Sequence, residues 1–184
     1  MQLIKWFVWF LGIIPFFVQR FLSKIVAFYL LVVPNHSAQI TKLNIDLAYP
    51  ELSEHQRLEI VRASLTDLGQ KFFSLISTWV RPTQNSYQLV KVVTGLDTFQ
   101  NASGKKPTLI LLPHIGNWEL FGVWLTQYRS YTAMFRPLRI YHISEMVRKA
   151  RERGGNILVP ATTIGVRQIW KRLNNAETAI LLPD

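Results

Sequence analysis

The sequence predicts an α/β fold: an N-terminal membrane-associated helix, a helical segment, and then a mixed or parallel sheet flanked by helices. Three observations support this prediction. The first 33 residues are almost wholly apolar, a long helical pattern follows residue 53, and short apolar runs alternate with helical patterns from residue 107 onward. Strands that alternate with helices are typical of a parallel or mixed sheet. We therefore divide the chain into a membrane anchor or interfacial helix, 1–33, and one domain, 34–184.

The composition also indicates a membrane partner. Hydrophobic residues make up 49% of the 184 residues and charged residues only 17%, whereas soluble domains carry about 25% charged residues. The net charge of +10 suits an anionic lipid, a nucleic acid or an acidic protein. The chain has no cysteine, which excludes disulfides, cysteine nucleophiles and thiolate metal sites.

The segment 6–33 is the predicted anchor. Its first apolar run, 6–18, is shorter than the roughly 20 residues that a spanning helix needs, and Pro15 bends it. Arg20 and Lys24 share a helix face and can reach phosphate headgroups while the rest lies in lipid. A cleaved signal peptide and a buried core helix are the alternatives, but no small-x-small cleavage site follows the first run, and aromatic residues surround the helix. Spanning, re-entrant and flat arrangements all stay open.

The middle of the chain is predicted to be helical. The segment 44–50 is typical of an extended or turn conformation, and Ser53 then begins a helix, with Gln56 completing a capping-box pattern. Arg81 and Pro82 end this helix. Apolar residues recur along it at spacings of three and four, and we interpret them as packing surface. They are Leu58, Val61, Leu65, Leu68, Phe72, Leu75 and Trp79.

The second half contains the predicted sheet. Gly154 and Gly155 end the second of its helices, and Thr163 is the predicted cap of the third. The expected strands are 107–112, 131–135, 156–159 and 178–182, and the expected helices are 118–128, 140–153 and 163–173.

His114 follows the first of these strands, at the carboxyl end where functional sites of open α/β sheets gather. On one regular helix, His114 and Glu119 would be rotated by about 140° and could not meet. They can meet if His114 lies in the turn, Gly116 permits a tight backbone, and Asn117 caps a helix whose first turn holds Glu119. The carboxylate would then orient the imidazole as a general base. A histidine at a strand end can equally be an ordinary polar residue, so the pair alone is a hypothesis.

A basic band, residues 129–153, follows this motif. It holds seven basic residues against Glu145 and Glu152, a net charge of +5, and we expect it to face a phosphorylated or acidic ligand. Several of its members can instead be ordinary surface charges. The histidines His36, His55 and His142 lack partners at metal-ligand spacing, and no zinc pattern or glycine-rich nucleotide loop is present, so we expect no metal.

The segment His114-Ile-Gly-Asn-Trp-Glu119 resembles the His-x4-Glu motif of the lipid A late acyltransferases, the lauroyl and myristoyl acyltransferases of outer-membrane biogenesis. Other segments resemble motifs of the same family, in the same order along nearly the whole chain. They are Leu43-Asn44 with 48–53, Phe135-Arg136-Pro137, Arg151-Glu-Arg153-Gly154, and Leu182-Pro183-Asp184.

The resemblance implies a glycerolipid-acyltransferase-like fold and an enzyme on the cytoplasmic face of the bacterial inner membrane. It implies transfer of a fatty acyl group from acyl carrier protein, as co-substrate without a further cofactor, to a hydroxyl of an anionic lipid A precursor. By resemblance His114 is the base, Glu119 its partner, and Asp184 the functional aspartate. Arg151 is the best match for the functional arginine, and Arg153 is its close competitor.

The substrate-binding candidates follow from the same chemistry. The tetrahedral intermediate of acyl transfer carries a negative oxygen that needs hydrogen-bond donors. The backbone N–H groups of Gly116, Asn117 and Trp118 could supply them, and so could an arginine such as Arg136 or Arg153; the choice stays open.

Two alternatives remain at this point. An acyltransferase for another glycolipid or phospholipid would more often carry Asp where this chain has Glu119. Family members are usually longer and continue beyond the position of Asp184, so we expect the domain 34–184 to be incomplete at its C-terminal side, and a truncated, non-catalytic lipid-binding membrane protein is the second alternative. Nucleic-acid binding is not expected, because the chain has an apolar N-terminus and no recognition motif.

Overall fold

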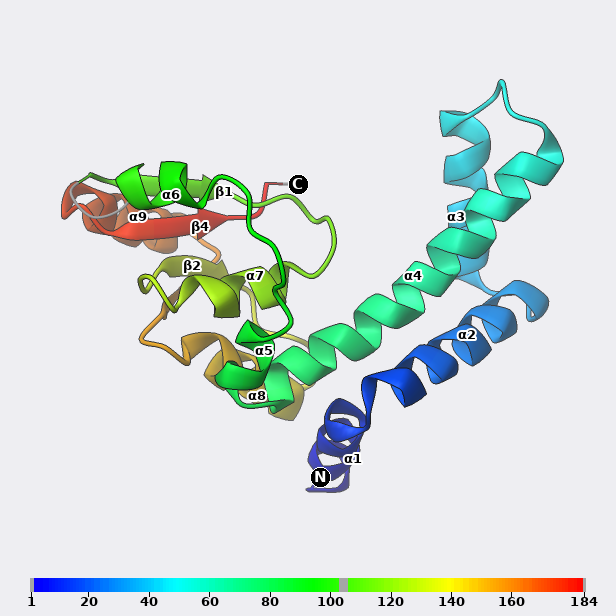
Figure 1. Ribbon diagram of the computed structural model, residues 1–184, viewed down its shortest axis with the longest axis horizontal. Helices are drawn as coiled ribbons and strands as arrows, with labels where there is room; N and C mark the ends of the chain where they lie inside the picture. The colour runs from blue at the N-terminus through cyan, green and yellow to red at the C-terminus, as the bar shows by residue number, and fades with distance from the viewer. Residues whose placement is uncertain (1, 103–105, 184) are drawn as a thin grey trace.

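The computed structural model describes residues 2–102 and 106–183, which form a helical arm and an α/β part joined in a V (Figure 1). The arm consists of α1 (Gln2–Ile13), α2 (Phe16–Val32), α3 (His36–Ala48) and α4 (Glu54–Val80). The helices of the α/β part are α5 (Thr83–Tyr87), α6 (Leu96–Ala102), α7 (Trp118–Leu125), α8 (Tyr141–Glu152) and α9 (Thr163–Asn174). Its strands are β1 (Thr108–Leu111), β2 (Thr132–Phe135), β3 (Ile157–Pro160) and β4 (Thr178–Leu181).

The four strands form one sheet in the order β1-β4-β2-β3, and every pairing is parallel. Successive residues of a strand point to opposite faces, and in β4 both faces are covered. Ile180 packs with Trp124 and Leu125 of α7, whereas Ala179 packs with Ile169 of α9. The predicted α/β class with a parallel sheet flanked by helices is therefore confirmed.

The face of α2 that packs in the arm carries small and polar side chains. The residues that α2 buries are Gln19, Ser23 and Ala27. On α4, Gly69 lies against Ser23 so closely that a Cβ there would come within 3.0 Å of the Ser23 carbonyl oxygen. The absence of a side chain at this position allows the close approach of the two helices.

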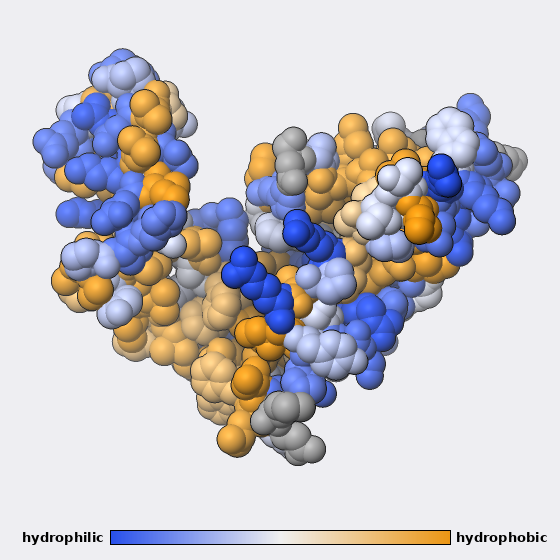
Figure 2. Space-filling model, turned by 180° about the vertical axis from the view of Figure 1, so that it is seen from behind, coloured by the Kyte–Doolittle hydropathy of each residue, from blue (hydrophilic) through white to orange (hydrophobic). Residues whose placement is uncertain are grey.

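The outer surface of α2 is largely apolar. Phe17 is 75% exposed, Phe21 64% and Phe28 67%. Figure 2 shows hydrophobic surface gathered over the lower part of the arm, towards the junction of the V. Within the described residues no single helix is long and apolar enough to cross a membrane, although α1 and α2 together meet that test as a pair bent by 111°.

The break between α1 and α2 is fixed by α4. Arg81, just after α4, donates from Nε to the Gly12 carbonyl at 2.9 Å and from Nη2 to the Ile14 carbonyl at 2.8 Å. Gln19 donates to the Leu11 carbonyl at 3.1 Å and to the Ser77 hydroxyl at 2.7 Å. These bonds satisfy carbonyls that the end of a helix leaves unpaired.

The structure confirms the helix that begins after Ser53 and corrects its packing face. The Ser53 capping box with Gln56 is present. The predicted stripe is wrong at Leu68 and Phe72, which are 48% and 55% exposed. The buried residues recur instead every four positions, as Val61, Leu65, Gly69 and Phe73, because Gly69 is the contact point with α2.

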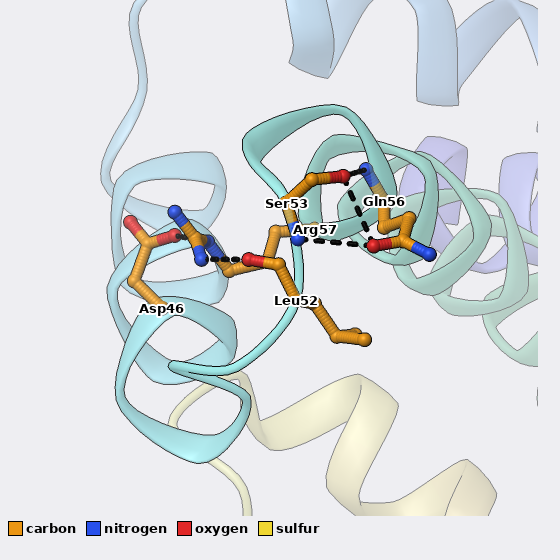
Figure 3. Close-up of polar contacts among 5 residues, drawn as sticks. All are labelled: Asp46, Leu52, Ser53, Gln56 and Arg57. Atoms are coloured by element: carbon orange, nitrogen blue, oxygen red, sulfur yellow. Dashed lines mark hydrogen bonds and ion pairs between the residues drawn. The ribbon is translucent and has the colours of Figure 1, made fainter.

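The extended or turn segment predicted at 44–50 is wrong for residues 44–48, which form the end of α3. Asn35 begins this helix, its side-chain oxygen accepting from the Ala38 N–H at 2.9 Å. Asp46 then binds Arg57 Nε at 2.8 Å, and Arg57 also donates to the Leu52 carbonyl, so that the turn between α3 and α4 is closed (Figure 3).

The remaining boundaries differ little from those expected. The structure places Thr162, rather than Thr163, at the cap position of α9, and its side chain makes no capping hydrogen bond. Gly154 and Gly155 have φ angles of +82° and +81°, which confirms that they end α8 in a conformation that glycine favours.

Candidate active site

The turn between β1 and α7 has the local geometry that the sequence predicts. Gly116 has a φ of +64°, and the Asn117 side-chain oxygen accepts from the Leu120 N–H at 3.0 Å, so Asn117 is the cap of α7. The Asn117 amide group also donates to the Ser74 hydroxyl at 2.7 Å. The cap therefore ties the turn that carries His114 to helix α4.

Glu119 lies in the first turn of α7 and is only 6% exposed. Arg151, from the last turn of α8, holds its carboxylate. The Arg151 Nε lies 3.0 Å from one carboxylate oxygen and 3.1 Å from the other, and Nη2 makes a further close contact. A charge-assisted pair of this kind compensates a buried charge and fixes its orientation.

His114 is exposed and lies in the turn after β1. Its ring packs edge-on against Trp118, with the ring centroids 5.0 Å apart. In the described part of the chain, the hydrogen bonds to the Glu119 carboxylate come from Arg151. Direct orientation of the imidazole by Glu119 therefore stays a prediction.

One cavity of about 290 Å³ brings the three strongest candidates together, since His114, Glu119 and Arg151 all line it. It lies at the carboxyl end of β1 and β4, where the predicted site was expected. The rest of its lining is almost wholly apolar: Leu112, Trp118, Gly122, Tyr131, Ala133, Met134, Ile180 and Leu182.

Tyr131 is a cavity residue that sequence reasoning missed. It is 8% exposed, and a Cβ at Gly122 would come within 2.7 Å of its hydroxyl oxygen. Burial, followed by the nearby negative charge of Glu119, raises the pKa of Tyr131, so the hydroxyl stays neutral. Nothing in the local sequence marks it, because its role depends on its position just before β2, facing α7.

The structure separates the two competing arginines. Arg153 donates from Nη1 to the Arg81 carbonyl at 2.7 Å and from Nη2 to the Thr78 and Trp79 carbonyls at the end of α4. Burial lowers its pKa. Arg153 is not among the residues that line the His114 cavity, and its role in binding substrate stays a prediction.

The other candidates have different positions. Trp118 contacts His114 and lines the cavity. Arg136 is exposed, one residue beyond β2. Asp184 lies outside the described residues. Within those residues, no group of three or more His, Cys, Asp or Glu side chains is placed to hold a metal ion.

Much of the predicted basic band makes contacts within the chain. Arg129 donates to the Ala176 carbonyl at 3.3 Å, and Arg148 binds Glu145 and Glu152 on its own helix. Together with Arg151 and Arg153, four of the seven cations thus have intramolecular partners.

Comparisons with known proteins identify the family of the chain. A family model described as bacterial lipid A biosynthesis acyltransferase matches residues 2–184. A search of the curated proteins finds no match.

Proposed function

The chain belongs to the bacterial lipid A biosynthesis acyltransferase family, and from this premise we propose that it transfers a fatty acyl group from acyl carrier protein to a hydroxyl of a lipid A precursor. The observation that carries the proposal is the cavity lined jointly by His114, Glu119 and Arg151. An exposed base at the mouth of a largely apolar cavity suits a reaction between a polar hydroxyl and a fatty acyl thioester.

In this reaction His114 takes the proton of the acceptor hydroxyl as its oxygen attacks the thioester carbonyl carbon. The new C–O bond forms, the C–S bond breaks, and His114 returns the proton to the departing thiolate. The products are an ester and a free thiol. No nucleophilic serine or cysteine is required, because the substrate supplies the nucleophile.

Glu119 and Arg151 serve the same step from the cavity wall. The buried Glu119 carboxylate favours the imidazolium that forms when His114 takes the proton. Arg151 holds that carboxylate in one orientation through Nε contacts to both oxygens. The negative oxygen of the tetrahedral intermediate takes its donors from the backbone N–H groups of 116–118.

The apolar lining of the cavity suits the acyl chain. Gly122 lies where a side chain would meet the Tyr131 hydroxyl, so these two residues form a wall that a longer chain has to pass. The membrane supplies the acceptor, and the apolar outer surface of α2 is the part of the chain that enters it. We place the enzyme at the cytoplasmic face of the bacterial inner membrane, where acyl carrier protein is available.

The test is acyl transfer in detergent from lauroyl- or myristoyl-acyl carrier protein to a tetra-acylated lipid A precursor. We expect turnover by the wild type and a loss of at least about 100-fold for His114→Ala. His55→Ala is the matched control, because His55 is exposed at the start of α4, on the helical arm. Equal activity in all three proteins, or none in the wild type, would overturn the proposed reaction.

A further inference from the structure

A second cavity, of about 390 Å³, lies on the other side of the catalytic turn. Its walls come from α2 and α4, and Gly116 and Asn117 of the turn close one end. It shares no lining residue with the cavity of His114. The two cavities therefore flank the segment 114–119 and could hold two different parts of the reactants.

The lining of this second cavity mixes apolar and polar side chains and carries an excess of positive charge. Arg20 of α2 and Lys71 of α4 are its cations, and Asp67 is its one acid among the described residues. Asp67 is paired with Lys71 at 2.7 Å and is itself 56% exposed. Arg20 has no carboxylate within ion-pair distance in the part of the chain that the structure describes. One cation is therefore left to pair with an anion from outside.

The position of Arg20 relates this cavity to the apolar surface of the arm. Phe17 and Phe21, its neighbours on α2, are 75% and 64% exposed. Gln19, which also lines the cavity, is buried against α4. The cavity thus lies at the border between an outward apolar surface and a polar interior, the level at which a lipid headgroup lies when its chains are in a membrane.

We propose that this cavity binds the phosphorylated sugar headgroup of the acceptor, with the cations Arg20 and Lys71 contacting its phosphate. The inference rests on the proposed function, because it assigns the acceptor's binding site. Cationic side chains form strong, charge-assisted hydrogen bonds with phosphate, and the neutral groups of Gln70 and Ser74, which also line the cavity, suit sugar hydroxyls. A headgroup bound here lies beside the turn that carries His114.

The test measures binding apart from turnover. The full chain carrying His114→Ala is equilibrated in detergent micelles with radiolabelled tetra-acylated acceptor, either phosphorylated or with its phosphates removed. Arg20→Gln is added to this background, and so is Arg62→Gln as a matched control. Arg62 is an exposed cation of α4 that does not line the cavity.

We expect Arg20→Gln to weaken binding of the phosphorylated acceptor about tenfold or more, since a hydrogen bond to a charged group is lost. Binding of the dephosphorylated acceptor should change less than about twofold, and Arg62→Gln should have little effect on either. Asp67→Asn should act in the opposite direction and strengthen binding of the phosphorylated acceptor.

Three results would overturn the inference: unchanged binding in Arg20→Gln, an equal loss for both acceptor forms, or an equal loss in Arg62→Gln, which would indicate general attraction to anionic micelles. Selective loss in Arg20→Gln with no acyl transfer by the wild type would support this site and refute the proposed reaction. Acyl transfer by the wild type with unchanged acceptor binding in Arg20→Gln would support the proposed reaction and refute this binding site.

Discussion

Arg151 and Arg153 lie two residues apart at the end of α8, yet they bind different parts of the molecule. Arg151 holds the carboxylate of Glu119 in the cavity, whereas Arg153 donates to carbonyls at the end of α4. Arg81, one of the residues that Arg153 contacts, in turn binds carbonyls at the break between α1 and α2. The contacts of three arginines, Arg81, Arg153 and Arg151, therefore connect the helical arm with the candidate active site.

The Glu119–Arg151 pair predicts a difference between single and double variants. Arg151→Met should lower the free energy of unfolding by about 3 kcal/mol, because it leaves a carboxylate that is 6% exposed without its partner. Glu119→Gln with Arg151→Met should recover most of that loss without restoring acyl transfer. Urea unfolding and the transfer assay measure the two properties. A double variant no more stable than Arg151→Met would contradict this interpretation of the pair.

Arg153 should matter for stability rather than for substrate. Arg153→Ala should destabilise the fold by about 1 kcal/mol, because carbonyls at the end of α4 lose a half-buried donor. Hydrogen exchange should then accelerate at the amides near the end of α4. Arg148→Ala is the control, since Arg148 pairs with Glu145 and Glu152 on the exposed side of its own helix, and it should change little. Equal stability losses in the two variants would contradict the prediction.

Asn117 should fix the catalytic turn in two ways. Asn117→Ala removes the cap of α7 and the hydrogen bonds to the Ser74 and Thr78 hydroxyls, so we expect a loss of about 2 kcal/mol in the free energy of unfolding. Ser74→Ala removes the contact with Ser74 alone and should cost about 1 kcal/mol. Thermal unfolding of both variants measures the two losses in stability and so checks their ratio. A loss in Ser74→Ala as large as in Asn117→Ala would mean that the cap contributes nothing.

Tyr131 predicts a pH dependence of stability. Its folded-state pKa is raised above the unfolded value of about 10, so the folded state retains a proton that the unfolded state loses. The stabilisation is complete below pH 10 and decreases as the pH rises above it. Between pH 9 and 11, the free energy of unfolding measured by urea denaturation should fall more steeply for the wild type than for Tyr131→Phe. Tyr128→Phe, at an exposed tyrosine, should follow the wild type; parallel curves for all three would contradict the prediction.

The apolar surface of the arm predicts binding to lipid vesicles. Phe17→Glu with Phe21→Glu should reduce the affinity about tenfold or more, because two exposed rings would no longer enter the lipid. Trp170→Glu is the control, since this ring of α9 is 67% exposed but lies outside the arm. Flotation with anionic vesicles measures the bound fraction. A similar loss in the control would mean that the arm is not the membrane-binding part.

Sequence reasoning succeeded where the determinants are local. The tight backbone at Gly116 and the helix cap at Asn117 are predictable from the geometry of one turn. The helix cap at Ser53 is predictable from a pattern four residues long. The contact of Glu119 with Arg151 joins residues 32 positions apart, so no spacing rule could find it, and only the family motif pointed to Arg151.

The errors have a common physical cause. Periodicity shows that α4 is helical but not which apolar residues meet a partner, because Gly69 has no side chain and hydropathy does not mark it as the contact. Leu68 and Phe72 were therefore assigned to the wrong environment. Tyr131 was missed for a related reason, since its burial depends on α7 packing across the sheet.

The 111° break between α1 and α2 has a consequence for the lipid as well as for the protein. Two helices at this angle cannot both lie along the bilayer normal. An arm whose two helices both lie near the membrane plane in this shape occupies a single leaflet and adds area to that leaflet alone. Such one-sided insertion is favoured where the outer leaflet is already stretched. The protein should therefore bind small, highly curved vesicles more tightly than large, flat ones of the same composition.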